Sequence, residues 1–181
     1  MLGNASNPML AQAEQGIQAK IPQAKQADFQ KVIQAGLTIM YSPKLEQQRN
    51  ANLANSKDPI SDASQGASRL VMNLYQQSGK KLTPDLMISA SVIFALEYLD
   101  LVAKAGKVQI TPDMIAQATQ KTVEAVLPLF KAPDGSQVLS TDKIQQIGAQ
   151  LQSQTGQGAP QGAAPAAAPS GGIISNAMQG A

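Results

Sequence analysis

The sequence predicts an all-α fold: a small helical bundle with a disordered N-terminal arm and a flexible C-terminal tail. Apolar residues recur at intervals of three and four along several segments, which is the repeat of a helix with one buried face. Aromatic residues make up only 3% of the chain, so its core must be built from Ala, Leu, Ile, Val and Met, which suit helix packing. Ser-Pro or Thr-Pro pairs precede several of these segments, as is typical of helix starts.

Composition divides the 181 residues into three parts. Residues 1–22 are rich in Ala and Gln and carry a thin apolar stripe, which predicts a loosely ordered arm with one weak helical turn near Met9–Ala19. Residues 23–154 carry the apolar repeats and form the predicted bundle. Residues 155–181 are rich in Gly, Ala, Pro and Gln and have no charged side chain, which indicates a flexible tail.

The first helix of the bundle is predicted over 23–41, where apolar side chains fall on one side. Gly36 lies within this helix and costs about 1 kcal/mol relative to alanine. Two interpretations stay open for it: it lets another helix approach closely, or it has no selected role. Ser42 resembles an N-cap and Pro43 a first helical residue, which predicts a second, short and polar helix.

Three longer helices follow, each opened by a capping residue and closed by a glycine or a proline. The middle one is apolar nearly all round over Leu86–Leu96, as is typical of the central helix of a bundle. We expect the apolar face of Ala27–Tyr41 to pack against it. A further helix is predicted from Thr141 to Gln154 by a narrow apolar stripe. The expected starts and ends of the three longer helices are Ser61–Asp62 to Gly79, Thr83 to Gly106 and Thr111 to Pro128.

Membrane insertion is not predicted. The most apolar run, Leu86–Leu96, is shorter than the roughly 20 residues that a membrane-spanning helix needs. The N-terminus has neither a basic start nor a continuous apolar stretch, so no secretory signal is expected. We therefore expect a cytosolic or particle-borne soluble protein with no transmembrane segment. An interfacial helix in the arm is an alternative, as is a protein that crosses a membrane after a trigger.

The sequence predicts no catalytic, cofactor-binding or metal-binding residue. It contains no Cys and no His, which excludes disulfides, thiol nucleophiles, imidazole bases and the usual zinc sites. Glu97 and Asp100 lie three apart on one helix, and two carboxylates can cleave a glycoside at separations of roughly 5 to 9.5 Å. We prefer another interpretation, in which the helix leaves the core there and Asp100 pairs with Lys104 four residues on.

Nucleic-acid binding is not favoured either. The net charge is only +2 and the lysines are scattered, whereas proteins that grip many phosphates carry a denser basic stripe. Several lysines could contact phosphate and three tyrosines could stack on bases, but solvated loop lysines and core-edge tyrosines are the preferred interpretation. The residues concerned are Lys80, Lys81, Lys104, Lys107, Tyr41, Tyr75 and Tyr98.

Contact with other proteins is the class of function that remains. Ile173, Ile174 and Met178 form a small apolar tip at the end of the uncharged tail. Such a tip can act as a docking peptide that orders on binding, or it can be a frayed end with three chance apolar residues. Both interpretations stay open.

The segment Pro22–Gln48 carries a resemblance to a known family. Its pattern VxxAGxxxMYS, followed by a short polar helix, resembles small helical virion-associated proteins of tailed bacteriophages. The resemblance covers about residues 22–130 and implies a structural or assembly role without catalytic residues. It also implies a location in the virion or the host cytoplasm, and other virion or assembly proteins, or a second copy, as partners. The matching residues are Val32, Ala35, Gly36, Met40, Tyr41 and Ser42.

Three other functions stay open beside this one. The first is a cytoplasmic phage-encoded regulator or adaptor that never enters the particle. The others are a cell-wall hydrolase that uses Glu97 and a nucleic-acid-binding protein. The segment after Ser42 here reads PKLEQQ, whereas members of the family carry a charged or histidine-containing segment there.

Overall fold

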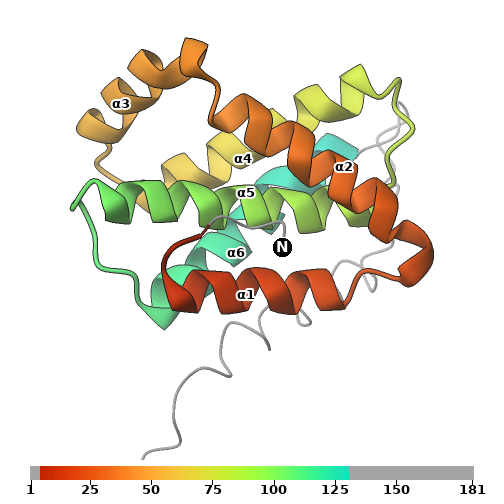
Figure 1. The fold of residues 1–181 in the computed structure, drawn as a ribbon, viewed down its shortest axis with the longest axis horizontal. Coiled ribbons are helices and arrows are strands. Elements are labelled where there is room, and N and C mark those ends of the chain that lie inside the picture. Colours follow the sequence, from red (N-terminus) through yellow and green to blue (C-terminus); the bar gives the residue numbers. More distant parts are fainter. Residues whose placement is uncertain (1–4, 131–181) are drawn as a thin grey trace, which may run out of the picture.

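The structure is a computed structural model that describes residues 5–130, and within that range it contains helices and no strand (Figure 1). The all-α prediction is therefore confirmed for the described residues. In chain order the elements are α1 (Pro8–Ala19), α2 (Gln23–Met40), the 3-10 helix η1 (Pro43–Leu45), α3 (Glu46–Asn55), α4 (Pro59–Gln77), α5 (Pro84–Lys104), α6 (Pro112–Val126) and the 3-10 helix η2 (Leu127–Phe130).

Helix α5 is the centre of the bundle. Figure 1 shows it crossing the middle of the molecule, with α1 below it, α2 across its front and α4 and α6 behind. It packs against all four of these helices, and nearly every side chain over Leu86–Leu96 is buried. The predicted central helix is thus confirmed.

The same helix passes a length and composition test for a membrane span. It has 21 residues, and 78% of its most apolar window is buried inside the protein. It is longer than Leu86–Leu96, because the helix continues over Pro84–Asp85 before that run and over Glu97–Lys104 after it. Burial of this kind is what the core helix of a bundle shows, and the absence of a transmembrane segment stays a prediction.

Helix α2 packs on α5 through a glycine. Gly36 is buried, and the ring of Phe94 lies so close to it that an added Cβ would overlap the ring carbons. A residue without a side chain is therefore required at this position. Of the two interpretations of Gly36, the one in which it lets another helix approach closely is confirmed. The expected packing of Ala27–Tyr41 on Leu86–Leu96 is confirmed by the same contact.

The N-terminal segment differs from the prediction. We expected a loosely ordered arm over 1–22 with one weak helical turn near Met9–Ala19. A helix does form there, but Pro8–Ala19 is a full helix, α1, that packs against α5. Asn7 caps this helix, since its Oδ1 accepts a hydrogen bond from the Met9 amide at 3.0 Å. A thin apolar stripe suffices here because packing on a central helix, more than intrinsic propensity, stabilises a short helix. The buried apolar side chains of this segment are Leu10, Ala13, Ile17 and Ile21.

The other helix boundaries agree closely with the prediction. Helix α4 begins at Pro59, slightly before the predicted Ser61–Asp62, because the Asp58 carboxylate accepts a hydrogen bond from the Ser61 amide at 3.1 Å and caps the helix. Gly79 and Gly106 have positive φ and follow α4 and α5, and Pro128 lies in η2 directly after α6. The predicted helix 141–154, the tail 155–181 and its tip Ile173, Ile174 and Met178 lie outside the described residues.

Candidate functional site

Two features flank one stretch of α5. Glu97 and Asp100 point to the side where α1 and the end of α2 lie, and they belong to a buried cluster of carboxyl groups. Phe94, Tyr98 and Leu101 line a groove on another face of the helix. The sequence predicted the helix but neither of these two environments.

Asp100 holds the beginning of α1 in place. It is 1% exposed and accepts hydrogen bonds from the amides of Ser6 and Asn7 at 3.0 and 3.1 Å. Lys104 forms an ion pair with it at 2.7 Å, as predicted. Burial raises the pKa of Asp100, but the hydrogen bonds from Lys104, Ser6 and Asn7 and the charge of Lys104 outweigh it, so this pKa lies below its ordinary value. A carboxylate of α5 therefore acts as a second cap for α1.

Glu97 joins the end of α2 to α5. It is fully buried, and its Oε2 accepts a hydrogen bond of 2.7 Å from the Tyr41 hydroxyl. Burial, followed by this hydrogen bond and the nearby negative charges, raises the pKa of Tyr41 well above its ordinary value. The expectation that Glu97 and Asp100 mark the emergence of the helix into water is wrong, because α1 and Tyr41 cover both carboxylates.

Glu14 is the third carboxyl of this cluster. It lies on α1, is 2% exposed, and its Oε1 has no hydrogen-bond partner among residues 5–130. Burial, with the charges of Glu97 and Asp100, raises the pKa of Glu14 to about 8, so it holds its proton at neutral pH. Sequence reasoning missed Glu14 because the arm was expected to be loose. The available signal was the spacing of Glu14, which falls on the same helix face as the apolar Leu10 and Ile17. A carboxyl group was not expected on that face, because a buried face is expected to be apolar.

The chemistry open to this acidic cluster (Glu14, Glu97, Asp100 and Tyr41) is limited. Among residues 5–130, no group of three or more acidic, His or Cys side chains has the geometry to hold a metal ion. Glu97 and Asp100 are buried, so a polymeric glycan does not reach them unless α1 moves away. This counts against a hydrolase that uses Glu97. The cluster instead links α1, the end of α2 and α5.

The residues considered for nucleic-acid contact have separate roles. Lys104 is engaged by Asp100, and the Lys107 ammonium lies 3.5 Å from the carbonyl of Ala54. Lys80 and Lys81 are exposed in the turn after α4. Tyr41 belongs to the acidic cluster, and the half-buried Tyr98 lines the groove.

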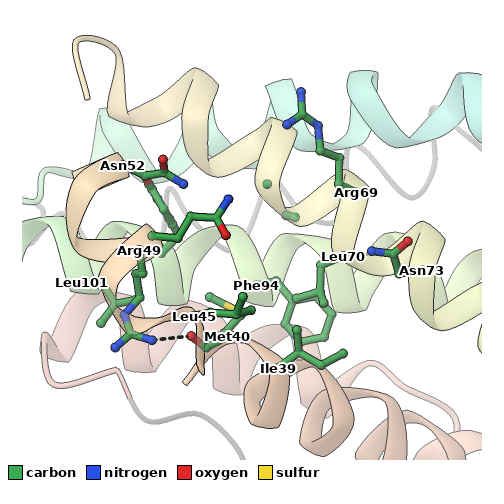
Figure 2. A pocket seen from close by; sticks show the side chains of 14 residues that line it. Ile39, Met40, Leu45, Arg49, Asn52, Arg69, Leu70, Asn73, Phe94 and Leu101 are labelled. Atoms are coloured by element: carbon green, nitrogen blue, oxygen red, sulfur yellow. Dashed lines mark hydrogen bonds between the residues drawn. The ribbon is translucent and has the colours of Figure 1, made fainter. Parts of the chain in front are cut away.

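The groove lies between α3, α4 and α5 and has a volume of about 330 Å³ (Figure 2). Its floor is apolar, with side chains from α5 and α4. One end is closed by the last turn of α2 and by Leu45, which is 38% exposed and is one of two exposed large hydrophobic side chains among the described residues. The floor residues are Ala67, Leu70, Phe94, Tyr98 and Leu101, and the end residues are Ile39, Met40 and Leu45.

Helix α3 forms the outer wall and is held by few contacts. Leu53 is the one buried residue within this helix. Arg49 donates a hydrogen bond of 2.7 Å to the carbonyl of Met40, the last residue of α2, as the dashed line in Figure 2 shows. This bond satisfies a carbonyl at the helix end and fixes α3 beside it. Since α3 is otherwise polar, it leaves a groove above the floor, where Tyr98 and Leu101 are half-buried and the other floor side chains are buried.

The rim of the groove is polar and carries positive charge. Arg49 and Arg69 line it, together with Gln48, Asn52 and Asn73, and within the described part of the chain no carboxylate does. Arg69 is exposed and has no ion-pair partner among the described residues. In the view of Figure 2, the Arg49 guanidinium lies at the left, beside Met40, and that of Arg69 lies at the top, above Leu70 and Phe94.

Comparison with protein-family models, with curated proteins and with solved structures gave no match to this chain. The groove and the acidic cluster are therefore interpreted from their own geometry. The resemblance to tailed-phage virion proteins stays a prediction.

Proposed function

We propose that this chain is a non-enzymatic structural or assembly component of a tailed bacteriophage, and that it acts through contacts with other proteins. The observation that carries the proposal is the groove beneath α3, which has an apolar floor and a polar rim at the surface. An uncovered apolar surface with a polar rim is typical of protein-binding sites. The phage context comes from the resemblance over Val32–Ser42.

The residues that carry the resemblance also build one end of the groove. Gly36 admits the ring of Phe94, which forms part of the floor. Met40 lines the groove and accepts the hydrogen bond from Arg49. Ser42 begins the turn that leads through η1 into α3. The pattern therefore supports a binding surface better than it supports chemistry.

A cytoplasmic adaptor that stays outside the particle is the second candidate. The same groove would serve it, so the two candidates differ in location and share a mode of action. Both differ from a nucleic-acid-binding protein, for which two rim arginines are a sparse basic surface.

Quantitative mass spectrometry of purified particles tests the proposal. The lysate of the infected cells, at matched total protein, is the comparison. A structural component is expected to be enriched in particles at a fixed ratio to the capsid protein. Presence in the lysate alone would contradict the virion role and favour the adaptor or an assembly factor that leaves before maturation.

A further inference from the structure

We propose that the groove binds the apolar face of an amphipathic helix whose flanks are acidic, supplied by a partner protein. This rests on the proposed function, because it names the partner chemistry of the same groove. The groove is the one described above, with its floor on α4 and α5, its wall on α3 and its end at Met40 and Leu45.

The walls favour a helix over an extended peptide. A strand-like peptide gains affinity by pairing its backbone with a free sheet edge. The groove is lined by helices, whose backbone groups bond within each helix, and Arg49 already occupies the carbonyl of Met40. An occupant must therefore satisfy its own backbone groups and contribute side chains alone. A helix meets both conditions.

The dimensions fit a few apolar anchors. The lining residues of α4 run from Gly66 to Asn73, a difference of seven positions that corresponds to about 10 Å along the helix. The volume of about 330 Å³ is at the lower end of the roughly 300–1,000 Å³ of small-molecule pockets. Anchors at i, i+3 or i+4, and i+7 of a partner helix span a similar length. Gly66 keeps this space free, since an added Cβ there would meet no atom within 4 Å.

The charge of the rim selects the flanks. Arg49 and Arg69 line the groove, and among residues 5–130 no carboxylate lines it to neutralise them. Asp or Glu beside the apolar anchors of the partner would pair with them, and Lys or Arg would be repelled. Because exposed charges act mainly on association and are screened by salt, binding is expected to weaken as ionic strength rises.

A display library of helical peptides, each about 18 residues long, tests the proposal on the immobilised full-length protein. Every peptide carries an apolar stripe at i, i+3, i+4 and i+7, flanked by Glu in one half of the library and by Lys in the other. Enrichment is expected in the Glu half alone. The best peptide, labelled with fluorescein, then serves as the probe in anisotropy titrations.

Two pairs of variants localise the binding. Gly66→Leu fills the groove, whereas Gly66→Ala leaves it open, and both replace a helix glycine by a better helix former. Arg69→Glu reverses charge at the rim, and Lys81→Glu makes the same change in the exposed turn after α4. The affinity is expected to fall about tenfold or more in Gly66→Leu and in Arg69→Glu, and to stay within about twofold in both controls.

Any of three results would overturn this partner: no enrichment, enrichment of the Lys half, or unchanged binding by a folded Gly66→Leu variant. Circular dichroism establishes that each variant is folded. The particle measurement separates this from the proposed function. If the protein is present in particles but binds no peptide, the acidic helix as partner is contradicted and the virion role stands. If the protein binds the peptide but is absent from particles, the virion role is contradicted and the groove with its acidic helical partner stands.

Discussion

Two sides of the same stretch of α5 differ in what covers them. On one side Glu97 and Asp100 are buried beneath α1 and Tyr41, and hydrogen bonds or an ion pair reach each of them. On the other side the buried Phe94 and the half-buried Tyr98 and Leu101 line a groove that α3 leaves open. Carboxyl groups are therefore fully buried on one side, whereas on the other side buried and half-buried apolar side chains border an open groove. Buried polar groups are uncommon and for that reason informative.

The difference follows from the two covering helices. Helix α1 brings a buried apolar stripe, and the chain at its N-terminus brings free amides. The Asp100 carboxylate accepts hydrogen bonds from these amides. Helix α3 has one buried residue, Leu53, and three asparagines that weaken it as a helix. A covering helix that brings apolar side chains closes its side of the bundle. A polar one leaves a site for another protein.

The largest effect is expected where the two sides meet, at Phe94. This side chain is 1% exposed, packs on Gly36 and forms part of the groove floor. Phe94→Ala removes that packing and leaves a cavity, so the free energy of unfolding should fall by about 3–5 kcal/mol. Urea denaturation followed by circular dichroism measures it.

A double-mutant cycle ties this loss to the close approach of α2. Gly36→Ala alone should lower the free energy of unfolding by about 1–2 kcal/mol, because the clash with the ring outweighs the gain in helix propensity. In the Phe94→Ala background the clash is gone, and Gly36→Ala should raise stability by up to about 1 kcal/mol. Additive effects would show that the ring does not set the spacing of α2 and α5.

The next effect on stability concerns the side of α5 that α1 covers, and it depends on pH. The pKa of Glu14 is about 8 in the folded protein and 4.5 in its ordinary state. The folded state therefore binds more protons than the unfolded chain between these values, and the free energy of unfolding falls as the pH rises through this window. Glu14→Gln keeps the shape and removes the titration, so at pH 7 it should be more stable than the parent by about 2–3 kcal/mol.

The gap between Glu14→Gln and the parent should close toward pH 4.5. The charged and titratable groups that act on this site are Glu97, Asp100 with its partner Lys104, and Tyr41. Glu124→Gln, at an exposed position on α6, is the matched control and should leave the pH dependence unchanged. Parallel pH profiles of parent and Glu14→Gln would show that Glu14 is not held neutral by burial.

A smaller loss of stability is expected when the Tyr41 hydroxyl, which donates to Glu97, is removed. Tyr41→Phe removes the donor to Glu97 Oε2 and leaves a buried carboxylate with one hydrogen bond fewer. A hydrogen bond to a charged group contributes about 1.5 kcal/mol or more, so the free energy of unfolding should fall by about that amount. Tyr98→Phe, on the groove side, is the control and should change it by less than about 0.5 kcal/mol. Equal losses in the two variants would contradict a special role for the bond to Glu97.

The sequence was sufficient to predict the helices from α2 to α6, the central position of α5 and the packing of α2 on it. Periodicity and capping residues are local, so the ends at Gly79, Gly106 and Pro128 and the central position of Leu86–Leu96 could be predicted. The packing of α2 on α5 followed from two apolar faces. Each of these features depends on residues close together in the chain or on a single periodic pattern.

Neither the acidic cluster nor the groove could be predicted, because each depends on distant residues. Glu97 and Asp100 have the spacing of solvated charges, and their burial depends on a helix some eighty residues earlier in the chain. Glu14 was placed in a loose arm because α1 is weak by itself. The groove arises from what α3 fails to cover, and an uncovered surface leaves no periodic pattern in the sequence.

The smallest effect separates the two helix glycines, and it has the opposite sign at each. Gly66 lies on α4 at the open groove, where an added Cβ would meet no atom within 4 Å, whereas at Gly36 it would overlap the ring of Phe94. Gly66→Ala should therefore raise the free energy of unfolding by up to about 1 kcal/mol, through helix propensity alone. Thermal denaturation of the two alanine variants side by side measures this. A loss of stability in Gly66→Ala would mean that the groove is already closed on that side, and the contrast between the two sides of α5 would have to be abandoned.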